Sequence, residues 1–189
     1  MNDTKPKLSK ALQQLIQTKP LDKIRISDIT DYCNMNRQTF YYHFHDIYDL
    51  IEYSYYHSPA GSLAIENIKN HPEYTWEEMF YELLYFIREN QLFISRVHHS
   101  LFSRYLDFFL EQSISDFVRR KLDKINENIQ VEEIYVEHIA AFYIHALVGR
   151  ITDWIDKGMK YSIDDAVYEL SRIMEGALVN TLQTFSSEK

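Results

Sequence analysis

The positions of apolar residues along the chain predict helices over most of its length. Leu8, Ala11, Leu12, Leu15 and Ile16 recur at intervals of three and four residues, the spacing that lines one face of an α-helix. Similar spacing continues toward the C-terminus, and no segment reads as a convincing strand. We therefore expect an all-α fold of about nine helices, near residues 8–19, 27–33, 37–44, 47–55, 76–87, 92–99, 105–125, 133–157 and 163–185.

Polar residues and glycine mark the expected ends of these helices. A Ser, Thr, Asn or Asp before a helix accepts a hydrogen bond from an amide of the first turn, and such N-caps are expected at Ser27, Asn36, Asp46, Thr75 and Ser162. Thr75 and Glu78 together match a capping box. Gly158 follows the long helix over 133–157, at the place where a glycine commonly ends a helix.

A break between two domains is expected at Ser58-Pro59-Ala60-Gly61, because proline and glycine interrupt helical patterns. Residues 1–57 then form an N-terminal domain, and residues 58–189 form a helical body for regulation and dimerisation. The first domain carries seven Lys and Arg against seven Asp and Glu, so the whole net charge of −8 belongs to the second. A neutral domain can bind DNA, but it lacks the strong phosphate attraction of a basic one.

The composition favours a protein of the cytoplasm. Cys33 is the single cysteine, so no intrachain disulfide can form and a reducing compartment fits best. Residues 1–6 contain no apolar run of the kind found in secretory signals. The uncharged apolar stretch over 139–149 is too short to span a bilayer. We therefore expect no membrane association.

The sequence offers little support for catalysis or metal binding. It contains no nucleophile elbow, phosphate loop or pair of catalytic carboxylates, so neither enzymatic activity nor a cofactor is expected. Four histidines, His98, His99, His138 and His145, raise the question of a metal site. They form no tight His-x-x-x-His pair, and the second half of the chain has no cysteine. Core or surface positions are therefore expected for them.

Residues 24–44 predict a helix-turn-helix, in which two short helices are separated by a turn at Asn34-Met35-Asn36. This geometry places the second helix in the major groove of DNA. Phe40 and Phe44 are four residues apart and are expected to face inward. The outward side chains are of types that bind base edges and phosphates, and with Asn36 they form the predicted DNA-binding set: Ser27, Asn36, Arg37, Gln38, Thr39, Tyr41, Tyr42 and His43. Alternatively, Tyr41, Tyr42 and His43 pack between helices.

This region resembles the TetR family of transcription regulators. The matching positions are Ser27, the run Thr39-Phe40-Tyr41-Tyr42-His43-Phe44, Asp46 and Leu50-Ile51. The resemblance implies that Ser27, Tyr41 and His43 hold phosphates, while Arg37, Gln38, Thr39 and Tyr42 face bases. Family members often carry lysines beside the acidic cap, whereas this chain has His45, Ile47 and Tyr48. Phosphate contacts are lost with those cations, so DNA affinity is expected to be modest or partner-assisted.

Residues 142–158 are similar to a TetR subgroup that includes regulators of dihydroxyacetone-kinase operons. The resemblance implies a homodimer that binds a palindromic operator, by default as a repressor, and responds to a small-molecule effector. The alternative is a co-regulator that binds DNA weakly alone and acts with a protein partner, as some members of that subgroup do. An effector cavity is expected at Phe102, Tyr105, Phe109, Phe142 and His145, although rings at helical spacing are also typical of plain core. A dimer interface is expected at Gly149, Trp154, Ile173, Ala177 and Leu178, with ordinary monomer core as the alternative.

Overall fold

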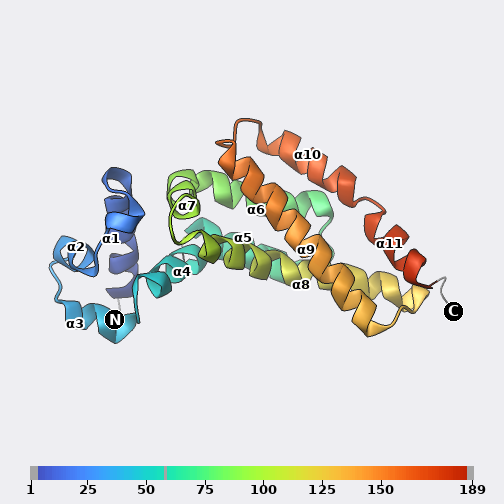
Figure 1. Cartoon of the computed structure of the whole chain (residues 1–189), viewed down its shortest axis with the longest axis horizontal. Helices are drawn as coiled ribbons and strands as arrows, with labels where there is room; N and C mark the ends of the chain where they lie inside the picture. The colour runs from blue at the N-terminus through green and yellow to red at the C-terminus, as the bar shows by residue number, and fades with distance from the viewer. Residues whose placement is uncertain (1–3, 58, 187–189) are drawn as a thin grey trace. The chain divides into compact units, whose positions relative to one another are not determined.

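The computed structural model describes residues 4–57 and 59–186, and within them every regular element is a helix (Figure 1). The α-helices are α1 (Thr4–Thr18), α2 (Ile26–Tyr32), α3 (Arg37–His43), α4 (Ile47–His57), α5 (Pro59–Asn70), α6 (Trp76–Glu89), α7 (Gln91–His98), α8 (Ser103–Ile129), α9 (Glu133–Asp156), α10 (Ile163–Met174) and α11 (Ala177–Ser186), with a 3₁₀-helix over Leu21–Lys23. The predicted all-α fold is thereby confirmed. The chain forms two compact units, one of residues 1–63 and 89–109 and the other of residues 64–88 and 110–189.

The first unit has a core built by α1, α2, α3 and α4. The predicted stripe of α1 is fully buried at Leu8, Leu12 and Ile16. Phe40 of α3 is 0% exposed, which confirms that it faces inward. A buried hydrogen bond of 2.8 Å between the hydroxyls of Ser9 and Ser54 joins α1 to α4. Burial of this apolar stripe holds four short helices together that would not be stable alone.

The corner between α7 and α8 belongs to the same unit. The Leu101 amide donates a hydrogen bond of 3.1 Å to the carboxylate of Asp22. The Tyr48 ring of α4 stacks on Tyr105 at 4.7 Å and meets the edge of Phe102 at 4.9 Å. Residues beyond position 100 therefore help to fix the N-terminal helices.

The second unit is built around α8 and α9, and basic side chains of α8 tie other segments to it. Arg119 forms an ion pair with Glu137 of α9. Arg120 donates to the Ile68 carbonyl at 3.1 Å, and Lys121 donates to the Tyr74 carbonyl at 2.5 Å. Two members of the run Arg119-Arg120-Lys121 therefore bond carbonyls, one at the end of α5 and one in the loop before α6.

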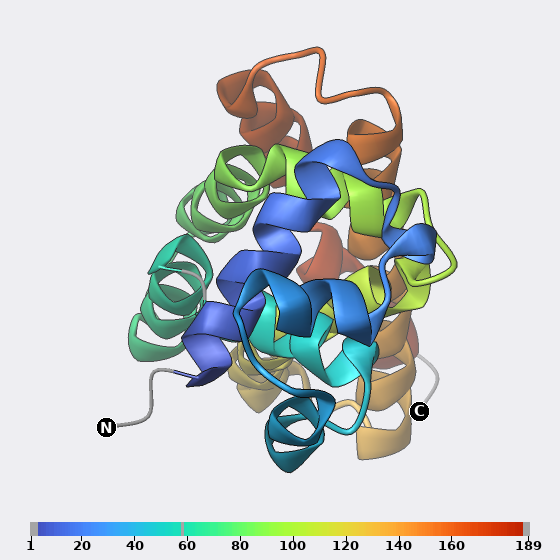
Figure 2. The same ribbon diagram turned by 90° about the vertical axis from the view of Figure 1, so that its left-hand side faces the viewer.

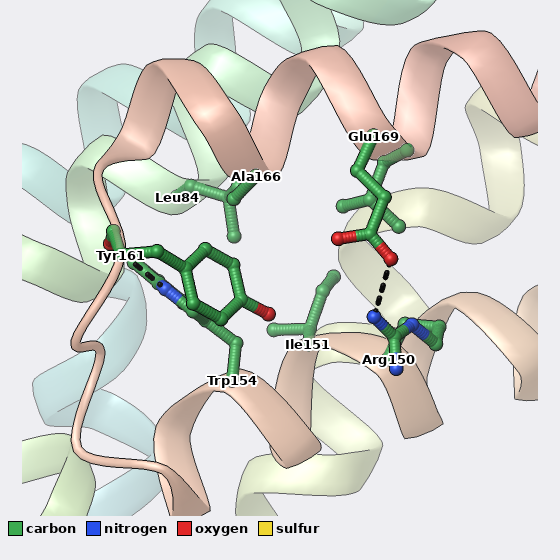
Figure 3. A pocket seen from close by; sticks show the side chains of 8 residues that line it. Leu84, Arg150, Ile151, Trp154, Tyr161, Ala166 and Glu169 are labelled. Carbon is green, nitrogen blue, oxygen red and sulfur yellow. Dashed lines mark hydrogen bonds and ion pairs between the residues drawn. The ribbon is translucent and has the colours of Figure 1, made fainter.

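The loop from α9 to α10 is anchored by Arg88 and Trp154. The Arg88 guanidinium donates to the carbonyls of Met159 and Tyr161 at 2.8 and 3.2 Å, and it lies 5.1 Å from the ring centroid of Trp154. Figure 3 shows the small cavity beside this loop, closed on one side by the pair of Arg150 and Glu169 at 2.6 Å. Its volume of about 10 Å³ is enough for roughly one water molecule and not for an effector.

The helix pattern differs from the prediction in two places. Residues 59–61 of the expected break (Ser58 lies outside the described residues) are the first residues of α5, a helix that was not predicted, because proline is well tolerated in the first turn of a helix. The single last helix expected over 163–185 is two helices, since Glu175 leaves the helical region and Gly176 has a φ of +75°. The described residues hold eleven α-helices in place of about nine for these reasons. None of the described helices combines the length and apolar character needed to cross a bilayer.

Candidate DNA-binding surface

The turn between α2 and α3 is tight and polar, as the sequence predicts. Asn34 has a φ of +52°, in the left-handed region that asparagine tolerates better than most residues. The Met35 amide donates to the Thr30 carbonyl at 2.8 Å, which turns the chain. Asn36 then caps α3, because its side-chain oxygen accepts from the Thr39 amide at 2.8 Å and from the Thr39 hydroxyl at 3.0 Å. The predicted cap at Asn36 is confirmed.

The start of α2 differs from the prediction. Ser27 is not its N-cap, since the helix begins at Ile26 and Arg25 is the capping position. The Arg25 amide donates to the Asp28 carboxylate at 2.7 Å, and Lys19 forms an ion pair with the same carboxylate. These partners, Lys19 first, lower the pKa of Asp28. A carboxylate three residues inside the helix therefore performs the capping that the sequence assigns to Ser27.

The two faces of α3 are sharply different. Phe40 is 0% and Phe44 5% exposed, and their ring centroids lie 5.7 Å apart in the core. On the opposite side Tyr42 is 84% and Tyr41 58% exposed. Arg37, Gln38 and Asn36 are also exposed, while Ser27, Thr39 and His43 are half-buried. Figure 2 shows α2 and α3 as consecutive short helices joined by this turn. The exposed side of α3 therefore offers a guanidinium, an amide and two phenols together.

Two cations of this unit, Lys5 and Lys19, are already engaged inside it. The Lys5 ammonium lies over the Phe44 and Tyr53 rings, at 5.5 and 5.7 Å from their centroids. Lys19 is held by Asp28 at 2.5 Å. Between α3 and α4, Asp46 accepts hydrogen bonds from the Tyr48 and Asp49 amides, which confirms it as the cap of α4. Arg37 is the single Lys or Arg of α3, so the exposed face of this helix is polar and aromatic more than it is basic.

Comparison with known proteins settles the family. The family model described as the TetR-type "Transcriptional regulator C-terminal region" matches residues 74–176, more than half of the 189 residues. The chain belongs to the TetR family of transcriptional regulators. Comparison with curated proteins gives no match. Among solved structures, the dihydroxyacetone kinase operon activator DhaS is similar in fold, with a TM-score of 0.65 and 18% identity over 96% of this chain and 97% of that one. The TetR family repressor AlkX from Dietzia sp. strain DQ12-45-1b, implicated in biodegradation of n-alkanes, aligns with a TM-score of 0.48 and 13% identity over 96% of each chain.

The five residues predicted to line an effector cavity in this TetR-family regulator lie in different surroundings. Phe102 and Tyr105 flank Tyr48 in the first unit, and Phe109 is 1% exposed there, stacked on Tyr55 at 4.8 Å. Phe142 is 68% exposed in the second unit, and the exposed His145 lies 3.7 Å from Glu111. Tyr105 lines a cavity of about 310 Å³ with Glu52, Arg104 and Phe108. Within residues 4–57 and 59–186, no group of three or more His, Cys, Asp or Glu is placed to hold a metal ion.

The residues predicted for the dimer interface divide by exposure. Trp154 and Leu178 are 1% and 2% exposed, covered by their own chain. Their burial argues against direct contacts with a second copy. Ile173 is 56% exposed and Ala177 is half-buried, so these two present apolar surface. A β-carbon added at Gly149 would meet nothing within 4 Å in the same chain, so contacts inside the chain do not explain this glycine.

Proposed function

We propose that this TetR-family protein binds a palindromic operator as a homodimer, with α3 of each copy in the major groove of one half-site. The observation that carries the proposal is the division of α3 into a buried face, Phe40 and Phe44, and an exposed face of Arg37, Gln38, Tyr41 and Tyr42. Arginine and amide side chains read base edges in the major groove, and hydroxyls bind phosphates. We further propose a cytoplasmic, non-enzymatic role in which operator binding represses transcription and a signal at the second unit changes the affinity.

The test is selection of bound duplexes from a random library, followed by fluorescence anisotropy on the selected site. Arg37→Ala and Tyr42→Ala are expected to weaken binding by about 1–3 kcal/mol per half-site contact. Both side chains are exposed, so the fold should be unaffected. Lys160→Ala, which removes an exposed charge from the second unit, is the matched control. Unchanged operator affinity in both α3 variants would refute the assignment of α3.

A second candidate function is that of a co-regulator that needs a protein partner for useful DNA affinity. Two contacts favour this second function: Lys5 lies over two rings, and Lys19 pairs with Asp28. These contacts leave fewer cations for DNA phosphates in a unit that is already neutral over residues 1–57. Sedimentation and anisotropy at about 0.15 M salt separate the two candidates. A well-folded dimer without selective binding supports the co-regulator, and tight selective binding by the isolated protein contradicts it.

A further inference from the structure

A groove between α1 and α2 in the first unit has no role in the function proposed above. Its volume is about 480 Å³, and it is lined by Lys7, Lys10, Ala11, Gln14, Tyr32 and Cys33. The four α1 residues occupy one face of that helix, while Tyr32 and Cys33 come from the last turn of α2 and the position after it. The groove therefore lies four residues before α3 in the chain.

The chemistry of the lining is dominated by hydrogen-bond donors. Lys7 and Lys10 bring two ammonium groups, and Gln14 and Tyr32 add an amide and a phenol. No carboxylate is among the lining residues. Two other cavities differ in this respect, since one includes Glu52 and another includes Glu77 and Glu175. An excess of donors and positive charge over acceptors is the arrangement that binds an anion.

The donors are also accessible. Lys10 and Gln14 are exposed, and neither side chain makes an ion pair or hydrogen bond with another described residue. The Tyr32 ring is 56% exposed and offers a face as well as its hydroxyl. Cys33 also lines the groove, and its thiol donates to the Lys7 carbonyl at 3.5 Å, which ties the end of α2 to α1. Its thiol pKa is raised by burial, which keeps it neutral.

We propose that this groove binds a phosphate group, held by Lys10 with help from Lys7, Gln14 and Tyr32. The phosphate comes either from the DNA backbone beside the operator or from a free phosphorylated metabolite. In the first case the inference rests on the proposed function, and the groove supplies phosphate contacts that His45, Ile47 and Tyr48 do not. In the second case the anion bridges α1 and α2 and steadies the turn that leads into α3.

The experiment compares the full-length wild type with Lys10→Met and with Lys23→Met, which removes a charge that is also exposed in the same unit but lies outside the groove. Inorganic pyrophosphate is titrated while the backbone amide signals of Gln14, Tyr32 and Cys33 are followed by NMR. Saturable shifts that persist in Lys23→Met and are lost in Lys10→Met support a free-phosphate site. In the DNA arm, the slope of log affinity against log salt becomes shallower by about 2 per dimer in Lys10→Met alone if the backbone is the source.

Two outcomes decide against the inference. Absence of pyrophosphate shifts together with an unchanged salt slope in Lys10→Met overturns it, even where operator binding by the wild type upholds the proposed function. Equal effects in Lys10→Met and Lys23→Met also overturn it, because they show a response to net charge. If the wild type binds no operator, the proposed function fails and the pyrophosphate titration alone decides for or against the groove.

Discussion

Replacement of Arg88 by alanine should destabilise the second unit more than the replacement of an exposed charged residue would. The guanidinium makes two hydrogen bonds to the carbonyls of Met159 and Tyr161 and lies over the Trp154 ring. Hydrogen bonds from a charged donor are worth roughly 1.5–3 kcal/mol each and a cation–π contact roughly 0.5–2 kcal/mol. Because Arg88 is only half-buried, the lower ends apply, and the expected loss in unfolding free energy is about 3.5 kcal/mol.

The assay is urea unfolding followed by tryptophan fluorescence. Trp76 and Trp154 are the two tryptophans of the chain and both belong to the second unit, so the signal reports that unit. Arg172→Ala is the matched control, since Arg172 pairs with Glu175 on the surface, a type of contact worth about 0–1 kcal/mol. The reasoning about the α9–α10 loop is refuted if Arg88→Ala loses less than about 1 kcal/mol, no more than such a surface pair.

Three further changes are expected to have measurable effects. Asn36→Ala should lower the stability of the first unit by about 1 kcal/mol through loss of the α3 cap, seen in urea unfolding followed by circular dichroism, and Asn36→Ser should retain most of it. Gly149→Ala should raise monomer stability by roughly 0.5–1 kcal/mol, since the space is open, and should weaken the proposed dimer in sedimentation. The pKa of Glu78 is lowered from its ordinary value of 4.5 by hydrogen bonds from Thr75, so its contribution to stability is fully present above that ordinary value and is lost as the pH falls through the lowered one. Acid titration of Glu78→Gln should show a smaller loss than the wild type over that range, and an identical curve would contradict this.

The sequence was most informative where local chemistry decides the structure. The caps at Asn36, Asp46 and Ser162 depend on bonds to amides two or three residues away, and all three are present. The buried stripe of α1 and the inward rings of α3 follow from helical period alone. Thr75 and Glu78 also form the predicted capping box. These features need no knowledge of distant parts of the chain.

The errors arose where two choices have similar local propensity or where the partner is far away in sequence. Proline at 59 is compatible both with a linker and with the start of a helix, and in the structure it begins α5. Asp28, not Ser27, accepts a hydrogen bond at the start of α2, from the Arg25 amide, and Lys19, nine residues earlier, pairs with the same carboxylate. The bonds of Arg120 and Lys121 reach back about 50 residues, so no local pattern could show them.

The positions of the charged side chains in the first unit, more than its net charge, determine which of them can reach DNA phosphates. Seven basic residues balance seven acidic ones over residues 1–57, but position matters more than the total. Lys5 and Lys19 are engaged inside the unit, whereas Arg37 is exposed on α3 and Lys10 is exposed in the donor-rich groove. Phosphate affinity scales with the number of cations that reach the backbone. The proposed base reading by α3 and the proposed phosphate site between α1 and α2 therefore account together for how a neutral unit could still bind DNA.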